Sequence, residues 1–579
     1  MINSLSPGGP LSKFKNFISK NMSHYLECDE EYLAGLITNP SNIEMGDFSL
    51  PCFSFAKKLK KSPQVIAEEC KTHMLSRKSP FEQIKAVSGY INFYIDKTEE
   101  AKTVLEEIYI NKETFGFSDI GQKKTITVDF SSPNIAKPIA FQHLRSTMIG
   151  NSICNILEFL NFDVKRINYL GDWGTNYGKL IVAFEKWGSS EKLKSFGVVH
   201  LVEIYQQFEK EKNEELENEA RSWFKKMEDG DTVALNYWKE FREISLCEFK
   251  KTYKRLNVNF HFFAGESAVN GLIAEVVDEI SEKLELKESS GAYIVEIGSN
   301  VPPVLIKKTD GASLYATRDI TEAIRRKKQF KFTKNLYIVA TQQNLHFKSV
   351  FTVLSMLGYD WSSDCEHVAF GMMLFNDKKM ATRSGNVVYL EDVLDKAKEL
   401  SLKIINEKNP DLEDKDDVAE KVGIGAIVFN DLKNKRIKDV NFNWSDVLNF
   451  DGETGPYVQY TYARIGSIFR KSSNSPDEFK VDLNEIDFKK LNTLEEIMLV
   501  KGLAAFPERL IEAAKTYEPS VIAKYLLELS SLFNIFYNKH KVISGDADYM
   551  KARLLLIYST RQIIKSCSKL LGLPLPERM

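Results

Sequence analysis

Three basic side chains lie in a short segment between a predicted strand and a predicted helix. They are Lys137, His143 and Arg145. All three follow the β-rich run TITVDF (125–130) and come before the apolar-periodic run STMIGNSICNILEFL. A tight loop that opens a helix presents backbone N–H groups and a positive helix end, and both bind phosphate. The added cations suit charge that develops on a transferring phosphoryl group. The segment therefore predicts a nucleotide site, although the chain has no G-x-x-x-x-G-K-[ST] motif and no strand followed by G-x-G-x-x-G.

A second basic segment lies far downstream, at DKKMATRSGNVVYLEDVLDKA (377–397). It places Lys379, Met380 and Arg383 in a predicted loop, which is followed by a short strand and a helix. Alone, such a segment is typical of a solvated surface loop.

A third group of residues could bind a guanidinium. SLYATRDITEAIRR (313–326) predicts the start of a helix with Tyr315 and Asp319 on one face. The alternative is an ordinary helix with an acidic first turn. VATQQNLHFKS continues from the strand NLYIV and puts Gln343 near the strand's carboxyl end, where doubly wound folds bind ligands. A carboxylate takes the planar guanidinium fork in two parallel hydrogen bonds, whereas a lysine offers only a point charge.

Three regions must position these residues. Residues 1–115 predict a small α+β domain, in which Ser62 caps a helix that begins at Pro63. Alternating strands and helices over 116–410 predict a doubly wound, Rossmann-like parallel sheet, with a connective insertion at about 185–300. Residues 411–579 predict an all-α bundle without strands.

The composition excludes several protein classes. The 579 residues carry a net charge of −2, so any nucleic-acid surface is local. Seven dispersed cysteines form no Cys-x-x-Cys pair, which argues against structural zinc and for the reducing cytoplasm. No apolar run reaches membrane-spanning length, so we expect no membrane partner.

Taken in order, the motifs of the chain closely resemble those of the arginyl-tRNA synthetases, a family of class I aminoacyl-tRNA synthetases. The first basic segment resembles the family's His-x-Gly-His signature, and the second resembles Lys-Met-Ser-Lys-Ser. The other matching strings are FSSPNIAKP, INYLGDWG, LYATRDI, QQNLHF, GETGPYVQYTYARIGSI and FNIFYN. The resemblance implies ATP-dependent ligation of L-arginine to tRNA(Arg) through an arginyl-adenylate, with release of AMP and pyrophosphate. It implies ATP with Mg²⁺ as co-substrate, no zinc, no organic cofactor and a monomer.

The resemblance also implies residue roles. Ser132 and Asn134, with Asp129 nearby, would hold the amino and carboxylate end of arginine. Tyr315, Asp319 and Gln343 would read the guanidinium. The implied ATP-binding residues are Ala140, Gln142, His143, Arg145, Lys379 and Met380. The implied catalytic residues are Lys137, His143, Lys379 and Arg383. The implied tRNA-binding residues are Tyr90 and Asn92 in the N-terminal domain, and Tyr457 and Tyr460 in the bundle.

Three positions depart from the family signatures. The first His and the Gly of the first signature are Ala140 and Gln142, and a side chain at the Gly position should crowd adenine. The second Lys of the downstream signature is Thr382, which makes Lys137 the candidate for the missing charge. These departures leave two alternatives open. One is a catalytically impaired paralogue that binds tRNA or arginine, and the other is an enzyme that adenylates arginine for another acceptor.

Overall fold

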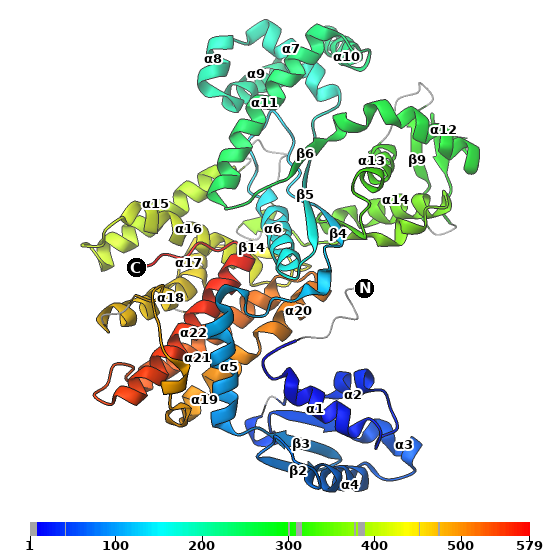
Figure 1. The fold of residues 1–579 in the computed structure, drawn as a ribbon. Helices are drawn as coiled ribbons and strands as arrows, with labels where there is room; N and C mark the ends of the chain where they lie inside the picture. The colour runs from blue at the N-terminus through cyan, green and yellow to red at the C-terminus, as the bar shows by residue number, and fades with distance from the viewer. Residues whose placement is uncertain are drawn as a thin grey trace.

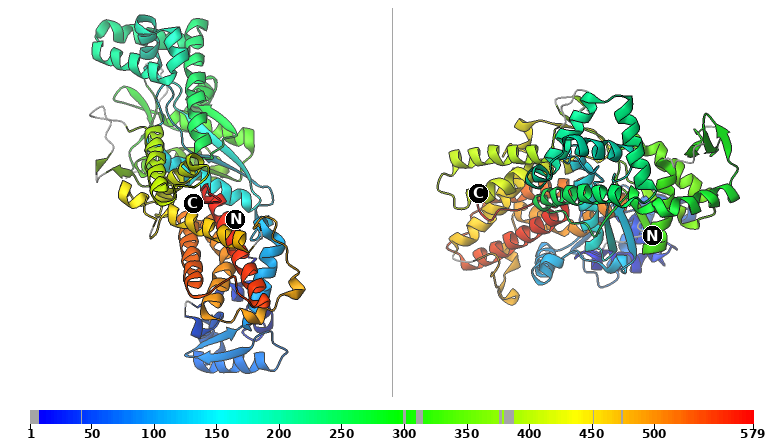
Figure 2. Two further views of the ribbon diagram at one scale, coloured as in Figure 1. Left: turned by 90° about the vertical axis from the view of Figure 1, so that its left-hand side faces the viewer. Right: turned by 90° about the horizontal axis from the view of Figure 1, so that it is seen from above.

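The computed structural model describes residues 8–40, 42–298, 301–308, 315–375, 378–379, 388–450, 452–472 and 475–579. The molecule is elongated, with a small α+β module at one end and a helical arm at the other (Figures 1 and 2). A parallel sheet and a helical bundle lie between them. The predicted fold class, an α/β sheet domain with an α+β module and a helical bundle, is confirmed.

The N-terminal module packs four helices on a three-stranded antiparallel sheet of order β1-β3-β2. Its elements are α1 (Ser12–Met22), α2 (Glu30–Leu36), β1 (Phe48–Pro51), α3 (Ala56–Leu59), α4 (Pro63–Leu75), β2 (Gln83–Val87) and β3 (Tyr90–Tyr94). The Ser62 side chain accepts a hydrogen bond from the Val65 amide, as the predicted cap requires. Its own buried core runs from Phe14 to Ile95.

A buried ion cluster ties this module to the bundle. Helix α5 (Lys97–Asn111) follows β3, and its apolar face belongs to the large core shared by the sheet and the bundle. Lys97 Nζ lies 3.0 Å from Asp47 and 3.2 Å from Glu100, and Lys501 from the bundle also pairs with both carboxylates. The predicted domain boundaries at 115 and 410 remain predictions, although α5 packs with the bundle.

Five parallel strands in the order β11-β10-β4-β5-β6 form the central sheet. The strands are β4 (Thr125–Asp129), β5 (Asp163–Leu170), β6 (Phe262–Gly265), β10 (Lys334–Tyr337) and β11 (Cys365–His367), and helix α6 (His143–Phe159) joins β4 to β5. Strand order reverses between β4 and β10. From β4 the chain adds β5 and β6 on one side of the sheet, and it then returns to add β10 and β11 on the other side. Ligands bind doubly wound sheets at the carboxyl ends of such strands.

Two additions interrupt the sheet domain. The helical arm lies between β5 and β6, and an α+β addition lies between β6 and β10. The arm contains α7 (Thr175–Trp187), α8 (Ser190–Phe196), α9 (Val198–Glu211), α10 (Glu214–Glu228) and α11 (Thr232–Arg255). The second addition contains α12 (Ile273–Lys283), β7 (Lys287–Ser289), β8 (Ala292–Val295), β9 (Val304–Lys308) and α13 (Tyr315–Phe330). Strand β6 therefore lies within the range 185–300 that the sequence assigns to an insertion.

The C-terminal part is helical with one exception. Helix α14 (Asn344–Met356), β12 (Met373–Phe375), β13 (Lys378–Lys379) and α15 (Leu390–Lys408) lead into it. It contains α16 (Lys415–Leu432), α17 (Trp444–Val447), α18 (Gly455–Lys471), α19 (Leu494–Ala504), α20 (Phe506–Thr516), α21 (Ser520–Lys539) and α22 (Ala547–Leu571). The expectation of no strand in the bundle region is wrong, because β14 (Val440–Phe442) pairs in parallel with β12.

Candidate active site

The loop after β4 is strained and held by buried polar groups. Ser131 and Ser132 both have positive φ, at 73° and 48°, a region that side chains other than glycine rarely occupy. The Ser131 amide donates to Ser146 Oγ at 2.9 Å, and its hydroxyl lies 2.7 Å from the Tyr253 hydroxyl of α11. Strain of this kind persists where the surroundings hold it, and it is frequent at ligand sites. The Ser132 hydroxyl donates to Asp129 at 2.9 Å.

The next residue of interest, Asn134, is exposed and packs over Gly171 of the GDWG string. The Ile135 amide donates to the Gly171 carbonyl at 3.2 Å, and the Gly171 amide donates to the Pro133 carbonyl at 3.2 Å. A Cβ at position 171 would lie 1.9 Å from Asn134 Oδ1. Glycine is therefore required there for Asn134 to keep this side-chain position.

Helix α6 starts at His143 and lies tightly against the sheet. A Cβ at Gly150 would meet the Phe130 side chain at 2.4 Å, so the glycine permits close approach of helix and strand. His143 Nδ1 lies 3.2 Å from the Ala140 carbonyl, to which it donates. Burial lowers the pKa of His143, and this hydrogen bond only partly opposes the shift. The ring is therefore neutral at pH 7, with Nε2 available to an incoming ligand.

The two signature segments are hydrogen-bonded to each other. The Phe141 amide donates to the Val388 carbonyl at 2.9 Å, and the Leu390 amide donates to the Ile139 carbonyl at 2.8 Å. The chain that leaves the downstream signature is thus paired with the chain that enters α6. Lys379 is described only as a strand residue of β13, while Met380, Thr382 and Arg383 lie outside the described residues.

The segment that departs from the family signature has three different environments. Ala140 forms an antiparallel bridge with Tyr389. Phe141 is fully buried, with its ring 5.0 Å from that of Phe442. Gln142 is half-buried directly before α6, and its side chain makes no hydrogen bond to the described residues. Its amide is therefore not fixed by a hydrogen bond to the described part of the chain, and its predicted place beside adenine stays a prediction.

Lys137 is exposed, and Arg145 is not. The Lys137 ammonium lies 5.4 Å from the ring centroid of Tyr205 in α9, within cation–π range. It carries no ion pair to a described residue, so its charge is available to an anion.

Arg145 requires a correction. It is 1% exposed, and its Nε donates to Asp431 at 2.7 Å, while Nη1 donates to the carbonyls of Gly371 and Lys438 at 2.7 and 2.8 Å. The guanidinium joins α6 to the bundle and cannot also face a nucleotide. We therefore remove Arg145 from the set of ATP contacts.

Two of the three residues predicted to read a guanidinium, Tyr315 and Asp319, both contact His346. His346 Nε2 lies 2.6 Å from Asp319 Oδ2, and the rings of Tyr315 and His346 are 4.6 Å apart. Gln343 ends a 3₁₀ turn that follows β10 and directly precedes α14. Asp319 thus lies at the reversal of strand order, with an imidazole and a phenol beside it.

Sequence reasoning missed Glu266, which follows the carboxyl end of β6. Its carboxylate makes no hydrogen bond or ion pair to the described residues. Burial raises its pKa to about 7; Arg318 opposes the shift, and the carboxylates of Asp319 and Asp172 add to it. Asp172 is already satisfied by Ser267 and Arg242. Glu266 and Asp319 therefore leave negative charge at this site that a cationic ligand would neutralise. A Gly-Glu pair at the carboxyl end of the short strand β6 is the signal that could have revealed it.

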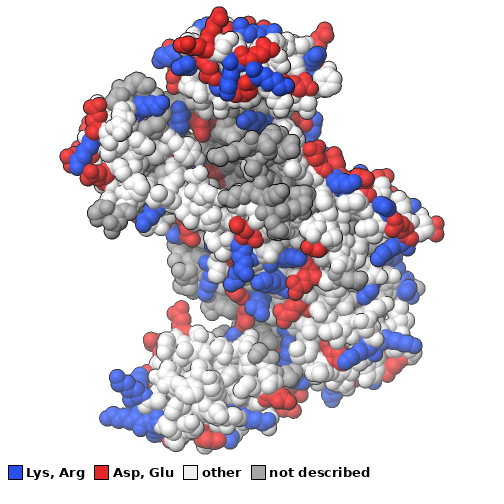
Figure 3. All heavy atoms as spheres, turned by 180° about the vertical axis from the view of Figure 1, so that it is seen from behind, with Lys and Arg blue, Asp and Glu red and all other residues white. Residues whose placement is uncertain are grey.

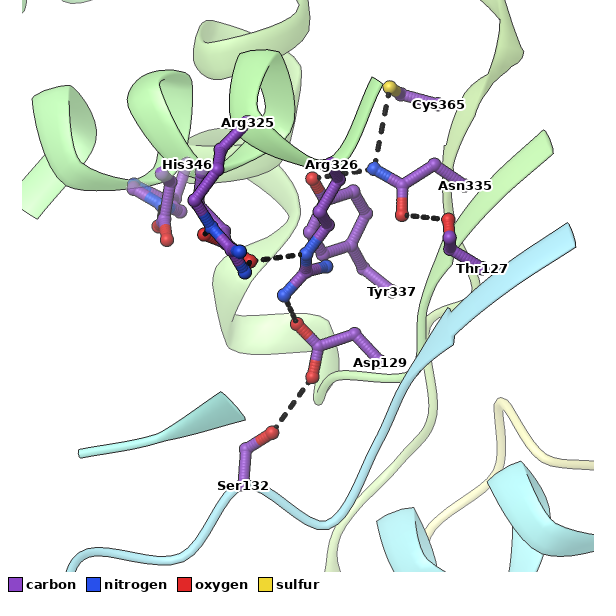
Figure 4. A network of polar contacts seen from close by, with 11 residues as sticks. Thr127, Asp129, Ser132, Arg325, Arg326, Asn335, Tyr337, His346 and Cys365 are labelled. Carbon is purple, nitrogen blue, oxygen red and sulfur yellow. Dashed lines mark hydrogen bonds and ion pairs between the residues drawn. The ribbon is translucent and has the colours of Figure 1, made fainter. Parts of the chain in front are cut away.

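Asp129, which is predicted to lie near the amino end of arginine, accepts from the Ser132 hydroxyl with one oxygen. It is buried, and its Oδ2 accepts from Arg326 of α13 at 2.6 Å (Figure 4). Arg326 thus occupies one oxygen of this carboxylate, and the assignment of Asp129 to the arginine site stays a prediction.

Two of the predicted tRNA contacts lie in the N-terminal module. Tyr90 is exposed beside Phe53, with ring centroids 5.2 Å apart. Asn92 is 3% exposed, and its Oδ1 accepts from the Ser49 hydroxyl at 2.7 Å. Asn92 therefore supports the sheet and cannot make the predicted contact from this position. On the face turned away from the viewer of Figure 1, this module is largely uncharged, with basic side chains along its outer edge (Figure 3).

The other two lie on α18, in an aromatic platform. Tyr460 is 41% exposed, and Arg464 lies 4.6 Å from its ring and 5.0 Å from that of Tyr537 on α21. Asn534 joins the platform by accepting from Arg464 at 2.7 Å and donating to the Tyr457 hydroxyl at 2.9 Å. Exposed aromatic and arginine planes are surfaces on which unpaired bases stack. Tyr457 supports the platform from within, and the rings of Tyr460 and Tyr537 form its solvent-exposed surface.

Comparison with known proteins decides the family. Residues 104–444 match the model described as tRNA synthetases class I (R), catalytic domain. The chain belongs to the arginyl-tRNA synthetase family. Residues 12–95 match the family's N-terminal domain, and residues 458–579 match the DALR anticodon binding domain.

Members of the family align with this chain over its whole length. The chain is 44% identical over 570 residues to the arginine–tRNA ligase of Clostridium kluyveri, which covers 98% of this chain and 100% of the relative. The arginine–tRNA ligase of Clostridium botulinum (strain Okra) matches equally well. The structure of arginyl-tRNA synthetase from Plasmodium falciparum has 26% identity and a TM-score of 0.80, covering 99% of this chain and 100% of that one. That from Thermus thermophilus, at 24% identity, shares the fold with a TM-score of 0.82, covering 98% of this chain and 99% of that one.

Two kinds of structural feature are absent from the described residues. No helix in this part of the chain is long and apolar enough to cross a membrane. Within the same residues, no group of three or more His, Cys, Asp or Glu side chains could hold a metal ion.

Proposed function

We propose that this chain ligates L-arginine to its cognate tRNA through an arginyl-adenylate, releasing AMP and pyrophosphate. The observation that supports this most directly is the pair Asp319 and Glu266, neither of which forms an ion pair with a described lysine or arginine. A guanidinium supplies a planar, permanent cation that can bridge two carboxylates. Lysine, as a point charge, would satisfy them less well, so the pocket discriminates without an editing domain.

The adenylation step uses the opposite end of the pocket. Ser132 and Asn134 bind the amino and carboxylate end of arginine, which orients the carboxylate for in-line attack on the α-phosphate of ATP. His143 meets the phosphates with a neutral imidazole, because burial lowers its pKa. Pyrophosphate departs with the Mg²⁺ that enters with ATP, and the ribose hydroxyl of the terminal tRNA adenosine then takes the arginyl group.

Lys137 supplies the positive charge of the second signature lysine, whose position is occupied here by Thr382. Its ammonium lies on the face of Tyr205, an attraction worth about 0.5–2 kcal/mol that a triphosphate would exceed. Lys379 and Arg383 carry further positive charge in the downstream signature. Together these cations stabilise the leaving pyrophosphate.

Binding of tRNA uses two separated surfaces. Tyr90 and its neighbour Phe53 bind the outer corner of the tRNA, and Tyr460 on α18 stacks with anticodon bases. The protein acts as a cytoplasmic monomer. Light scattering of the purified protein during size-exclusion chromatography, with and without tRNA, tests the monomer directly, since a dimer would double the mass.

The decisive experiment is aminoacylation with labelled arginine, ATP and tRNA(Arg). We expect arginyl-tRNA to form, and lysine to be charged far more slowly than arginine. Retained tRNA binding without charging would support the impaired paralogue instead, and equal charging of lysine would refute the assigned pocket. Adenylation without transfer to tRNA would indicate another acceptor.

Replacing Lys137 tests the catalytic assignment. Lys137→Ala should lower the rate of adenylate formation by about 10²-fold, the usual cost of one transition-state contact, with little effect on tRNA binding. Lys123→Ala, an exposed lysine ahead of the amino end of β4, is the matched control. Equal rates for the two variants would remove Lys137 from the catalytic set.

A further inference from the structure

Helix α13 carries a buried arginine that no part of the proposed chemistry uses. Arg326 is fully buried, with its guanidinium carbon 5.3 Å from the ring centroids of both Tyr169 and Tyr337. Its Nε donates to Glu322 at 2.7 Å, and its Nη2 donates to Asp129 at 2.6 Å (Figure 4). A buried guanidinium is costly unless carboxylates neutralise it in good geometry, and these two do so.

The bond to Asp129 continues toward the pocket. The second oxygen of Asp129 accepts from the Ser132 hydroxyl at 2.9 Å, so Arg326, Asp129 and Ser132 form one chain of hydrogen bonds. Ser132 has a positive φ of 48°, a backbone conformation that needs support. Figure 4 shows this chain running from α13, across the end of β4, into the loop.

Arg326 also controls the charge of Asp129. Burial raises the pKa of Asp129, while the adjacent Arg326 guanidinium lowers it and so opposes protonation of the carboxyl. Without Arg326, a fully buried Asp129 would bind a proton at higher pH. Ser132 would then lose the ionised acceptor that fixes its hydroxyl.

We propose that Arg326 is a positioning residue, which holds Asp129 and through it Ser132 so that the loop after β4 fits the amino end of the amino-acid substrate. The inference rests on the proposed function, because Ser132 is assigned there as a contact to arginine. The same bonds occupy Asp129 and Glu322 with a guanidinium of the chain. Glu266 and Asp319, of which Asp319 is paired only with His346 among the described residues, are left for the substrate guanidinium, and this sets the direction in which arginine enters.

The spacing on α13 supports this division. Tyr315, Asp319, Glu322 and Arg326 are separated by four, three and four residues, so they share one helix face. The first two are assigned to the outer pocket, Glu322 pairs with Arg326, and Arg326 contacts Asp129 at the end of β4. One helix face thus positions both ends of the bound amino acid.

The adjacent Arg325 provides a matched control. It pairs with the same carboxylate, with Nε 2.6 Å and Nη2 2.8 Å from the two oxygens of Glu322. It is partly exposed and makes no bond to Asp129. An effect of Arg326 that acts through Asp129 should therefore be absent when Arg325 is replaced.

The experiment measures steady-state aminoacylation of tRNA(Arg) by the full-length protein. Arg326→Lys keeps the charge but cannot serve both carboxylates with a planar fork. We expect it to raise KM for arginine about 10-fold to 100-fold, the usual range for a lost charge-assisted hydrogen bond, with KM for ATP changed less than about 3-fold. Arg325→Lys should leave both KM values near those of the wild type. Equal KM values for arginine in the two variants would overturn the proposal.

A pH profile separates this role from general loosening of the fold. In Arg326→Met, Asp129 gains a proton more readily, so KM for arginine should fall more steeply between pH 6 and 9 than it does in the wild type. The double variant Asp129→Asn/Arg326→Met lacks the titrating group and should lose that extra slope. If the single variant does not fold, the double variant replaces it, because it leaves no unpaired carboxylate at position 129. KM for arginine is then measured in the double variant, and a value equal to that of the wild type would refute the proposal. Absence of charging by the wild type would instead refute the proposed function.

Discussion

Replacing Gly171 with alanine should disable arginine binding without unfolding the protein. The new Cβ would lie 1.9 Å from Asn134 Oδ1 and 3.0 Å from its Cγ, well inside van der Waals contact. The backbone cannot move away easily, because it is paired with Pro133 and Ile135 on either side of Asn134. The Asn134 carboxamide must therefore rotate out of its position. Alanine itself fits the backbone at 171, since that glycine does not have a positive φ.

The size of the effect follows from the bonds that Asn134 would lose. A hydrogen bond to a charged group contributes about 1.5–3 kcal/mol, so displacing the carboxamide should raise KM for arginine about 10-fold to 100-fold. KM for ATP should change little. Thermal unfolding should move by only a few degrees, because a short side chain at the rim gives way without opening the core.

Aminoacylation kinetics with varied arginine provide the assay. Gly171→Ala and Asn134→Ala should raise KM by similar factors, and the double variant should be no worse than either, because both changes remove one interaction. Gly35→Ala, at a helical position where a Cβ meets nothing, controls for glycine replacement as such. A wild-type KM in Gly171→Ala, or additive effects in the double variant, would refute the steric argument.

Three further results are expected. Asp431→Asn removes the carboxylate that pairs with buried Arg145 and should lower the free energy of unfolding by about 3–5 kcal/mol, measured by urea titration; a loss below about 1 kcal/mol would contradict the burial of the pair. Glu266 has a pKa raised to about 7, and a bound guanidinium favours its ionised form, so arginine binding at pH 7 should release protons; calorimetry in buffers of different ionisation enthalpy should show this in the wild type and not in Glu266→Gln. The pKa of His143 is lowered in the folded state, so its contribution to stability is present above pH 6.5 and is lost as the pH falls below that value. His143→Gln should therefore lose less stability between pH 6.5 and 5 than the wild type, and parallel losses would show that the ring is not buried as a neutral group.

Sequence reasoning succeeded where a local pattern determines local structure. The run that ends at Asp129 forms a strand, Ser62 caps its helix, and Tyr315 opens α13 with Asp319 one turn later. In each case propensity, periodicity or a capping residue acts within a few positions. The order of the motifs along the chain then indicated the family, because unrelated folds do not share so long an ordered set.

It failed where the partner of a residue lies far away in the chain. Arg145 looked like a phosphate ligand, because nothing near it in sequence reveals that Asp431 and four backbone carbonyls occupy its guanidinium. The family resemblance assigned Asn92 to tRNA, although Ser49 of the neighbouring strand binds its side chain. Arg326 was invisible for the same reason, since Asp129 is 197 positions away. Long-range pairing of buried polar groups is a property of the folded arrangement.

The pairing of the two signature segments affects how the protein is synthesised. On the ribosome the N-terminal module, with its own core, can fold as soon as it emerges. The segment before α6 must wait for residues 388–390, and α6 itself packs against α22, where Asn155 donates to the Lys569 carbonyl at 3.0 Å. A chain arrested before its last helix would therefore display a finished N-terminal module but an incomplete nucleotide site. We therefore expect arginine activation to begin only when translation of the enzyme is almost finished, because α6 lacks its partner helix until then.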